Sequence, residues 1–314
     1  MNKKVLVIMD PIESIDIKKD TSYQLMLSAQ KIGHKIYYLI PGTLSMNSEG
    51  PFGKICELQL NDKKENYFEI SEGKNFQLSY FNYILMRKDP PVDNNYIYMT
   101  YMLDALDNKI TKIINPGFTL RNHNEKLITL NFQKHIPESL VTRNKKDLEN
   151  FRYTHKNIIL KPLNLMGGRS VYYLAEKDKN FNVIYEEITN MGENYILAQK
   201  YISEAENGDK RVIIINGEVF KQAVIRKPNI NDHRSNLASG GTIEKYILNE
   251  NEISICNEVA SFLQKEKIYF AGLDMIGEKI TEINITSPTC IAEINKFHNI
   301  DLGVKFWEKI DGIN

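Results

Sequence analysis

The sequence predicts an α/β protein in which an N-terminal lobe with a doubly wound parallel sheet precedes a second, two-lobed unit. Three observations support this fold class. The chain begins with a strand, a helix and a strand, which is how doubly wound sheets start. Its second half contains two hairpin signals, Asn216-Gly217 and Gly277-Glu278-Lys279, each between apolar runs. Its 314 residues also exceed the length of one typical domain.

The first strand is predicted at residues 5–9, where apolar residues follow one another without interruption. Asp20, Thr21 and Ser22 are N-cap candidates for a helix that runs through Gln30. A second strand follows at residues 35–40. Ligands of doubly wound sheets bind beyond the carboxyl ends of the strands, and Ser14 lies in a segment at such an end.

Residues 42–80 are polar and rich in asparagine, which indicates decoration at the edge of the sheet. A strand at 83–86 then leads directly into Arg87-Lys88-Asp89-Pro90-Pro91. Two cations at the end of a strand, stiffened by two prolines, could clamp a carboxylate, and the alternative is an ordinary charged loop. A helix at 95–107 and a strand at 112–115 complete the lobe, which is predicted to end near residue 122.

The second unit is predicted to open with a helix over residues 119–133, which carries Lys126. A strand at 139–142 and a helix near 146–154 follow. The next strand, 158–162, ends in Lys161-Pro162 and continues into a loop that carries Gly167 and Gly168, before the strand pattern resumes at 171–174. Because this loop joins two strands, it is not a Walker P-loop. Glycines let backbone amides close over phosphate oxygens, although a plain hairpin turn is the alternative.

The following strand ends at residues 198–202, and a polar loop leads to Asp209. Arg211 opens an apolar strand, and the Asn216-Gly217 turn would place Arg211 near Gln222, with Arg226 further along the same sheet region. Residues 227–241 lack periodicity and are rich in Asn, Ser and Gly. This composition is typical of a mobile loop, and we expect a lid that carries Arg234 and Asn236.

A helix over residues 250–266 precedes the most informative segment, the hairpin within residues 272–289. If its turn centres on Glu278, Asp274 lies opposite Glu282 and Gly272 lies opposite Asn284. The three polar side chains then share one face, and apolar side chains share the other. Opposed carboxylates repel, so a cation should lie between them, and two acids with an amide suit Mg²⁺. The alternative is a polar face turned to water. Two short helical segments close the chain.

The amino-acid composition limits the classes of binding partner that we expect. Forty basic residues balance forty acidic ones, so the chain lacks the charge excess that favours nucleic acid or an anionic membrane. Its three cysteines are widely spaced, which indicates free thiols in a reducing compartment. No apolar run approaches the roughly 18 residues of a membrane span. We therefore expect a soluble cytoplasmic protein.

In this order, the parts resemble the ATP-grasp superfamily, and the motifs resemble those of the prokaryotic glutathione synthetases. The matching segments span almost the whole chain. They are MDPIESIDIKKDTS (9–22), LMRKDPP (85–91), NEKL (124–127), IILKPLNLMGG (158–168), GDKRVIIINGE (208–218), RSNLASGG (234–241) and GLDMIGEKITEINITSPTCIAEI (272–294). LMRKDPP and TEINITSPT are the most specific, because generic ATP-grasp enzymes share only the lysines and the metal ligands. Two departures are Asn164-Leu165, where many relatives carry Asp-Gly, and Ala292, where some carry Arg.

The resemblance implies a role for each matching residue. Lys126 and Lys161 would contact the nucleotide phosphates beneath Gly167 and Gly168. The adenine hinge would comprise Gln199, Lys200, Tyr201 and Ile202, with Asp209 at the ribose. The transferring phosphoryl group and the acyl phosphate would be steadied by Arg211 and Arg226, together with Arg234 and Asn236 from the lid. Mg²⁺ or Mn²⁺ would be held by Asp274, Glu282 and Asn284, and the dipeptide by Arg87 and Ser14.

The resemblance also implies the reaction and the domains. An ATP-dependent ligase would convert the carboxylate of γ-glutamylcysteine to an acyl phosphate, which glycine attacks to give glutathione, ADP and phosphate. Residues 1–122 would form the N-terminal domain and 123–314 the ATP-grasp domain, with a lid lobe at about 123–200 and a C-terminal lobe at about 201–314. A homo-oligomer is expected. The alternatives are another ATP-grasp carboxylate–amine ligase, or a nucleotide-binding protein without turnover.

Overall fold

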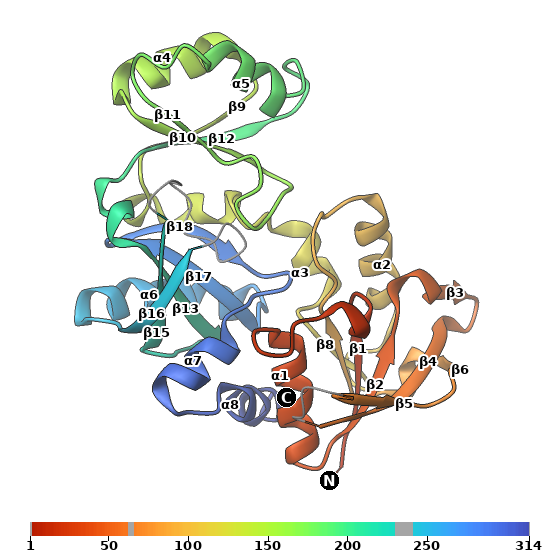
Figure 1. Cartoon of the computed structure of the whole chain (residues 1–314). Coiled ribbons are helices and arrows are strands. Elements are labelled where there is room, and N and C mark those ends of the chain that lie inside the picture. Colours follow the sequence, from red (N-terminus) through yellow and green to blue (C-terminus); the bar gives the residue numbers. More distant parts are fainter. Residues whose placement is uncertain (1, 62–65, 230–240, 314) are drawn as a thin grey trace.

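The computed structural model describes residues 2–61, 66–229 and 241–313 of the chain. Three sheets organise it: one in an N-terminal lobe, one in a small lobe that stands apart, and one in a C-terminal lobe (Figure 1). This arrangement confirms the predicted α/β class.

The core of the N-terminal sheet is parallel, as predicted. β1 (Lys4–Ile8) pairs with both β2 (Lys35–Leu39) and β7 (Tyr83–Met86), and β7 pairs with β8 (Lys112–Ile114). The intervening helices are α1 (Thr21–Lys31) and α2 (Asn94–Asp104). The side chain of Asp20 accepts a hydrogen bond from the Tyr23 amide, so the predicted N-cap of α1 is confirmed.

Residues 42–80 extend this sheet beyond β2 in the antiparallel sense. The extension consists of β3 (Ser45–Asn47), β4 (Gly50–Leu60), β5 (Phe68–Ile70) and β6 (Lys74–Gln77), and the order is β3-β4-β2-β1-β7-β8. The predicted edge position is confirmed. The strands themselves were not predicted: β3, β5 and β6 are short and contain no buried residue, whereas the alternating burial of β4 was missed. Short 3₁₀ turns are η1 (Ile12–Ser14), η2 (Pro41–Thr43) and η3 (Leu78–Tyr80).

The predicted helix over residues 119–133 is wrong. α3 (Gly117–Asn122) ends early, His123 is extended, and the chain resumes as a kinked 3₁₀ segment, η4 (Leu127–His135). The cause is local: the Asn124 side-chain oxygen accepts from the amides of Lys126 and Leu127, which competes with helical hydrogen bonding. Lys126 therefore lies at a turn.

The small lobe is a four-stranded antiparallel sheet in the order β11-β10-β12-β9. Its strands are β9 (Ser139–Thr142), β10 (Ile158–Pro162), β11 (Tyr172–Leu174) and β12 (Ile196–Lys200). α4 (Lys145–His155) and α5 (Phe181–Ile188), the latter not predicted, cover the face that points away from the rest of the molecule (Figure 1). The lobe has its own apolar cluster, which includes Leu148, Leu160 and Ile196.

The C-terminal lobe contains a sheet in the order β16-β15-β13-β17-β18, with β14 on β13. Its strands are β13 (Asp209–Ile215), β14 (Glu218–Val219), β15 (Gln222–Lys227), β16 (Thr242–Ile247), β17 (Phe270–Ile276) and β18 (Lys279–Asn284). Its helices are α6 (Glu250–Lys265), α7 (Ile291–His298) and α8 (Leu302–Asp311), and η5 (Ser203–Asn207) precedes β13.

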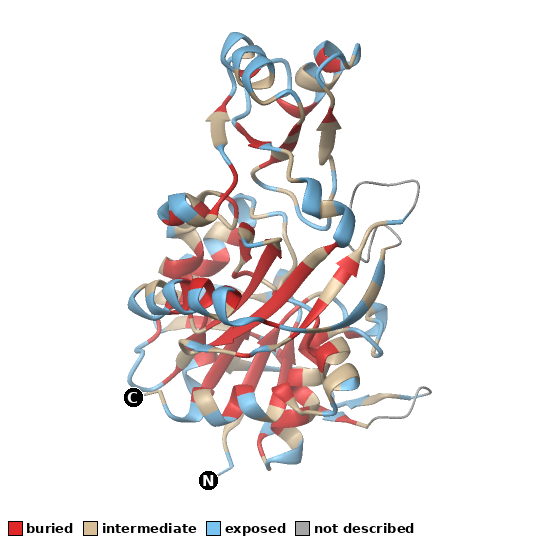
Figure 2. Cartoon of the chain, turned by 90° about the vertical axis from the view of Figure 1, so that its left-hand side faces the viewer, coloured by how far each residue is buried: buried red, intermediate tan, exposed pale blue. Residues whose placement is uncertain are grey.

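The N- and C-terminal lobes share their cores. One apolar cluster contains both Leu6 and Leu273, and a second contains both Val5 and Trp307. The buried Asn115, just after β8, donates to the carbonyls of Phe270 and Ile285 and accepts from the amides of Tyr269 and Phe270. Figure 2 shows buried residues concentrated in the strands of this combined body.

Two hairpin registers carry the functional side chains. In β17–β18, Gly272 lies opposite Asn284, Leu273 opposite Ile283 and Asp274 opposite Glu282, as predicted. The turn nevertheless differs: Met275 pairs with Ile280, so a two-residue turn is followed by a one-residue bulge, which together restore the predicted register.

The second hairpin corrects a prediction. Beyond its tip, where Ile215 lies opposite Glu218, the register shifts by two residues, and Arg211 lies opposite Val224 rather than near Gln222. A shift of two residues preserves the face of the sheet. Asp209 consequently lies opposite Arg226.

In the parts of the chain that the structure describes, no helix is both long and apolar enough to cross a membrane.

Candidate active site

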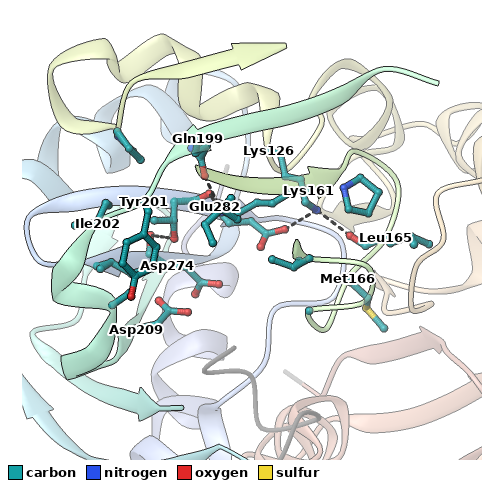
Figure 3. A pocket seen from close by; sticks show the side chains of 18 of the residues that line it. Lys126, Lys161, Leu165, Met166, Gln199, Tyr201, Ile202, Asp209, Asp274 and Glu282 are labelled. Carbon is teal, nitrogen blue, oxygen red and sulfur yellow. Dashed lines mark hydrogen bonds and ion pairs between the residues drawn. The ribbon is translucent and has the colours of Figure 1, made fainter. Parts of the chain in front are cut away.

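A cavity of about 110 Å³ lies between the small-lobe sheet and the β17–β18 hairpin (Figure 3). Eleven residues predicted at the nucleotide or the metal line it. They are Lys126, Lys161, Gly167, Gly168, Gln199, Lys200, Tyr201, Ile202, Asp209, Asp274 and Glu282. They come from both walls, so the two lobes together form one site.

The two lysines converge on one end of this cavity (Figure 3). The buried Lys126 Nζ donates to the Leu165 carbonyl at 2.8 Å and to Glu282 Oε1 at 2.9 Å. Lys161 Nζ donates to Gln199 Oε1 at 2.7 Å. Burial lowers the pKa of Lys161, and the nearby Glu282 carboxylate opposes that shift. Two ammonium groups at one end of a cavity suit a polyphosphate.

The glycine loop joins β10 to β11, as predicted. Gly167 and Gly168 have φ angles of 66° and 75°, a region that side chains with a Cβ rarely adopt. A Cβ at Gly167 would meet no atom within 4 Å, so its backbone conformation alone accounts for glycine. Leu165 and Met166 of the same loop line the cavity.

The end of β12 and the residues after it form a further wall of the cavity. Gln199 is buried between the Lys161 ammonium and Ser139 Oγ. Apolar residues missed by sequence reasoning, Pro137, Ile159, Ala205 and Ile276, line the cavity near Tyr201 and Ile202. They come from separate elements, so only the folded chain brings them together. An apolar end beside backbone polar groups suits a planar heterocyclic ring.

Four charged side chains form a buried network in the body beneath the cavity. Arg211 Nε and Nη2 donate to the two Asp274 oxygens at 2.6 and 3.0 Å. Arg226 Nη2 contacts Asp274 Oδ1 at 3.0 Å and Asp209 Oδ2 at 2.5 Å. A Cβ at Gly272 would lie 3.1 Å from Arg211 Cδ, so glycine leaves room for the arginine.

The network shifts the pKa values of Asp274 and Asp209 in opposite directions. Burial alone would raise the pKa of Asp274, but Arg211 and Arg226 outweigh it and lower the pKa to about 2. Burial raises the pKa of Asp209 to about 7, with a smaller contribution from the nearby Asp274 carboxylate, although Arg226 opposes the shift. Among the described residues, Asp209 Oδ1 and Arg226 Nε are buried without a hydrogen-bond partner. Asp274 is thus an anion at neutral pH.

The predicted metal ligands lie together on one hairpin. Asp274 and Glu282 are register partners, and Asn284 Nδ2 donates to Asp274 Oδ2 at 3.2 Å. The described residues contain no group of three or more His, Cys, Asp and Glu side chains suited to a metal. The predicted set has two carboxylates and one amide, and these hard oxygen donors fit Mg²⁺. Each acid already contacts protein cations: Asp274 pairs with Arg211 and Arg226, and Glu282 pairs with Lys126.

Glu125 was missed by sequence reasoning, although it is part of the NEKL segment. Its buried carboxylate accepts from the amides of Ile285 and Thr286 and from Thr286 Oγ1, at 2.7 to 2.9 Å. Burial raises the pKa of Glu125, and the Glu282 carboxylate adds to the shift. These bonds tie the turn that carries Lys126 to the end of β18.

A second cavity, of about 520 Å³, lies where the N-terminal lobe meets the start of α7. The predicted dipeptide residues Ser14 and Arg87 line it, together with Asp20, Thr289, Cys290 and Glu293. Arg87 is only 5% exposed, and burial lowers its pKa. Its Nε donates to Ser22 Oγ and its Nη2 to the Pro288 carbonyl, whereas Nη1 is buried with no partner among the described residues.

Arg211 connects the two cavities. While Nε and Nη2 hold Asp274 at the first cavity, Nη1 donates to Thr289 Oγ1 at 3.2 Å and to the Thr289 carbonyl at 3.3 Å, at the wall of the second. The predicted lid residues Arg234 and Asn236 lie outside the described residues.

Two family models match the chain. The prokaryotic glutathione synthetase N-terminal domain matches residues 3–121, and the prokaryotic glutathione synthetase ATP-grasp domain matches residues 125–299. Glutathione synthetases from Vibrio vulnificus (strain YJ016) and Shewanella oneidensis are 41% and 38% identical over 308 residues. The matched residues cover 98% of this chain in both cases, and 97% and 98% of the two relatives.

Solved structures with the same fold are more distant in sequence. D-cycloserine synthetase DcsG superposes with a TM-score of 0.68 at 10% identity, over 98% of each chain. The ATP-grasp ligase PsnB, in a structure with minimal precursor, Mg and ADP, has a TM-score of 0.61 at 14% identity, over 97% of this chain and 96% of PsnB.

Proposed function

The chain belongs to the prokaryotic glutathione synthetases, ATP-dependent ligases with the ATP-grasp fold, and we propose that its two cavities divide the reaction between them. The first cavity binds ATP, the second binds γ-glutamylcysteine, and phosphoryl transfer takes place at Arg211 between them. The double contact of Arg211, with Asp274 and with Thr289, carries this proposal.

We propose that the nucleotide spans the first cavity. Lys126 and Lys161 bind the phosphates at one end, under the amides of Gly167 and Gly168. The adenine lies against residues 199–202, and the unpartnered oxygen of Asp209 accepts a hydrogen bond from a ribose hydroxyl. Neither lysine is free in this structure, because Glu282 and Gln199 hold them, so phosphate binding exchanges those contacts for stronger ones with phosphate oxygens.

Asp274, Glu282 and Asn284 would hold Mg²⁺ beside the phosphates. The ion supplies charge neutralisation and Lewis acidity when bound. The low pKa of Asp274 fits this role, because a ligand must be deprotonated. Asn284 donates its amide N–H to Asp274 here, and its side-chain oxygen would be its donor to the ion.

The arginines stabilise the charge that develops during transfer. A carboxylate is a poor electrophile, and phosphorylation gives it a leaving group. Arg211 and Arg226, fixed by Asp274 and Asp209, hold positive charge beside the first cavity and need no rearrangement during the reaction. The lid residues Arg234 and Asn236 are proposed to complete the site.

Arg87 anchors the donor in the second cavity, which Ser14 also lines. The predicted bidentate pair is restricted by the structure, since Nε and one Nη2 hydrogen are engaged by Ser22 and Pro288. The carboxylate must therefore approach end-on, at Nη1 and the remaining Nη2 hydrogen. Arg87→Lys keeps the charge but loses this fork, so the KM for γ-glutamylcysteine should rise by the equivalent of about 1–3 kcal/mol.

The test is phosphate release from ATP with γ-glutamylcysteine, with and without glycine. Release should require the dipeptide and accelerate with glycine, and Arg87→Lys should leave the KM for ATP unchanged. No release with γ-glutamylcysteine would contradict the assignment of the second cavity, and a rise confined to the KM for ATP would contradict the role of Arg87.

We also propose that Mn²⁺ can replace Mg²⁺, that the enzyme is a homo-oligomer, and that it works in the cytoplasm. The all-oxygen donor set supports the first proposal. The three free cysteines support a reducing compartment. Turnover with each ion and light scattering of the purified protein test the first two.

A further inference from the structure

Glu293 is the carboxylate at the second cavity that the proposed mechanism leaves unexplained. It lies in the first turn of α7 and lines the cavity with Thr289 and Cys290. Its Oε2 atom is buried and has no hydrogen-bond partner among the described residues. A buried, unpaired carboxylate oxygen is costly to maintain, which points to a ligand.

The other acids of this cavity have partners or lie near Arg87. Asp10 pairs with Lys88 at 2.8 Å, Asp16 accepts from the Lys18 amide, and the Asp20 side chain caps α1. Asp20 and Asp89 raise the pKa of Arg87 against the effect of its burial, so both lie at the Arg87 end.

Glu293 lies at the reacting end. Burial raises its pKa, and the positive charges of Arg211, Lys19 and Arg226 act against that shift. Arg211 is also the residue that joins this cavity to Asp274 and donates to the neighbouring Thr289. Glu293 and Thr289 thus line the same cavity, close to the proposed site of phosphoryl transfer.

The charges of the reactants indicate which of them pairs with Glu293. The donor carboxylate and the transferred phosphoryl group are both anionic and would be repelled by Glu293. The donor's own α-ammonium lies near its distal carboxylate, which is assigned to the Arg87 end. The remaining cation is the ammonium of the incoming amino acid.

We propose that Glu293 forms the acceptor site: it binds the ammonium of glycine and removes a proton from it before attack. This inference rests on the proposed function of the two cavities. One proton passes from the ammonium to the Glu293 carboxylate, and the free amine forms the C–N bond at the acyl phosphate carbon. The C–O bond to phosphate then breaks, and the leaving phosphate takes the oxygen, the electron pair and a second proton from nitrogen.

Glu293→Gln tests the proposal, because it keeps the shape and removes both the charge and the base. The KM for glycine should rise about 10- to 100-fold, as expected for the loss of one charged hydrogen bond. The KM values for ATP and γ-glutamylcysteine should change less than about threefold. Hydroxylamine, which is uncharged at neutral pH, should still trap the acyl phosphate as a hydroxamate at near the wild-type rate, because it needs no base.

Glu250→Gln is the matched control. It removes an exposed first-turn acid from α6, away from both cavities, and should leave the KM for glycine unchanged. If Glu293→Gln fails to fold, Glu293→Asp retains the charge at greater distance and should raise the KM for glycine by a smaller factor.

Two results would overturn the acceptor site: an unchanged KM for glycine, or an increase confined to the KM for γ-glutamylcysteine, which would place Glu293 at the donor. Loss of hydroxamate formation in Glu293→Gln would also overturn it, because the defect would then precede acceptor binding. If the wild type itself forms no hydroxamate from γ-glutamylcysteine, the proposed function fails instead.

Discussion

The small lobe and the body on the other side of the nucleotide cavity are built differently. The small lobe packs around its own apolar cluster, and its ion pairs are exposed, such as Lys156–Glu176 with side chains 51% and 48% exposed. In the body, two sheets share their apolar clusters, and the side chains of Arg211 and Asp274 are 5% and 4% exposed. We therefore propose a division of labour, in which the small lobe binds nucleotide and moves as a unit, whereas the body holds the charges of the reaction rigidly.

The largest effects should come from two matched substitutions, each of which removes a buried side chain from one of the two cores. Leu160→Ala in the small lobe and Leu273→Ala in the body each remove a fully buried side chain and should cost about 2–5 kcal/mol. Amide hydrogen exchange is the measurement. Leu160→Ala should speed exchange within residues 139–200 only, and Leu273→Ala should speed it in both the N- and C-terminal sheets. Equal loss of protection everywhere in both variants would show that the lobe is not independent.

The next effect concerns the arginine that joins the cavities. Arg211→Lys keeps a charge but loses the paired contact with Asp274 and the contact with Thr289. Turnover should fall about 10²- to 10³-fold, as for the removal of one preorganised donor. The KM for ATP should stay within about threefold of the wild-type value. Lys156→Gln, which removes an exposed pair in the small lobe, should leave turnover unchanged.

Low pH should lower the folding stability of the body, because Asp274 becomes protonated. Its folded pKa, about 2, lies below the ordinary value of 3.8, so its ionised form contributes stability that is complete above pH 3.8. That contribution, about 2 kcal/mol, is lost as pH falls through 2. Unfolding followed between pH 5 and 2 should show this loss in the wild type, and Asp274→Asn should lack the corresponding slope. A parallel slope in both proteins would assign the acid sensitivity to other groups.

The smallest effect is expected in the glycine loop. Gly167→Ala meets no atom but must adopt a left-handed conformation, which costs about 1–2 kcal/mol. The loop is exposed and can relax in the free protein, so the cost should appear in nucleotide binding. We expect a 5- to 30-fold higher KM for ATP, which corresponds to about 1–2 kcal/mol of binding free energy. Turnover at saturating ATP should barely change, and a fall in turnover alone would contradict this role.

Local patterns in the sequence were sufficient for several parts of this site. The β17–β18 register was predicted from a turn centred on Glu278, and it is correct because the two-residue turn and the one-residue bulge together restore the same pairing. The glycine loop was recognisable because Gly167 and Gly168 stand between two strand patterns. The domain limits near residues 122 and 200 stay predictions.

Other features depend on contacts that local patterns do not contain. The side chain of Asn124 breaks the expected helix before Lys126, and the shift between β14 and β15 moves the position opposite Arg211. The charge between Asp274 and Glu282 was assigned to a metal alone, whereas Arg211 and Lys126 reach them from positions 63 and 156 residues away in sequence. Asn115 joins two lobes that the sequence pattern treats as separate.

One measurement tests the division of labour most directly: ATP affinity and single-turnover phosphoryl transfer to γ-glutamylcysteine, each determined for Gly167→Ala and Arg211→Lys. Gly167→Ala should weaken ATP binding and leave the transfer rate at saturating ATP near that of the wild type. Arg211→Lys should bind ATP normally and slow the transfer by about 10²- to 10³-fold. If both variants alter the same quantity, binding or transfer, the small lobe and the body do not divide the work as proposed.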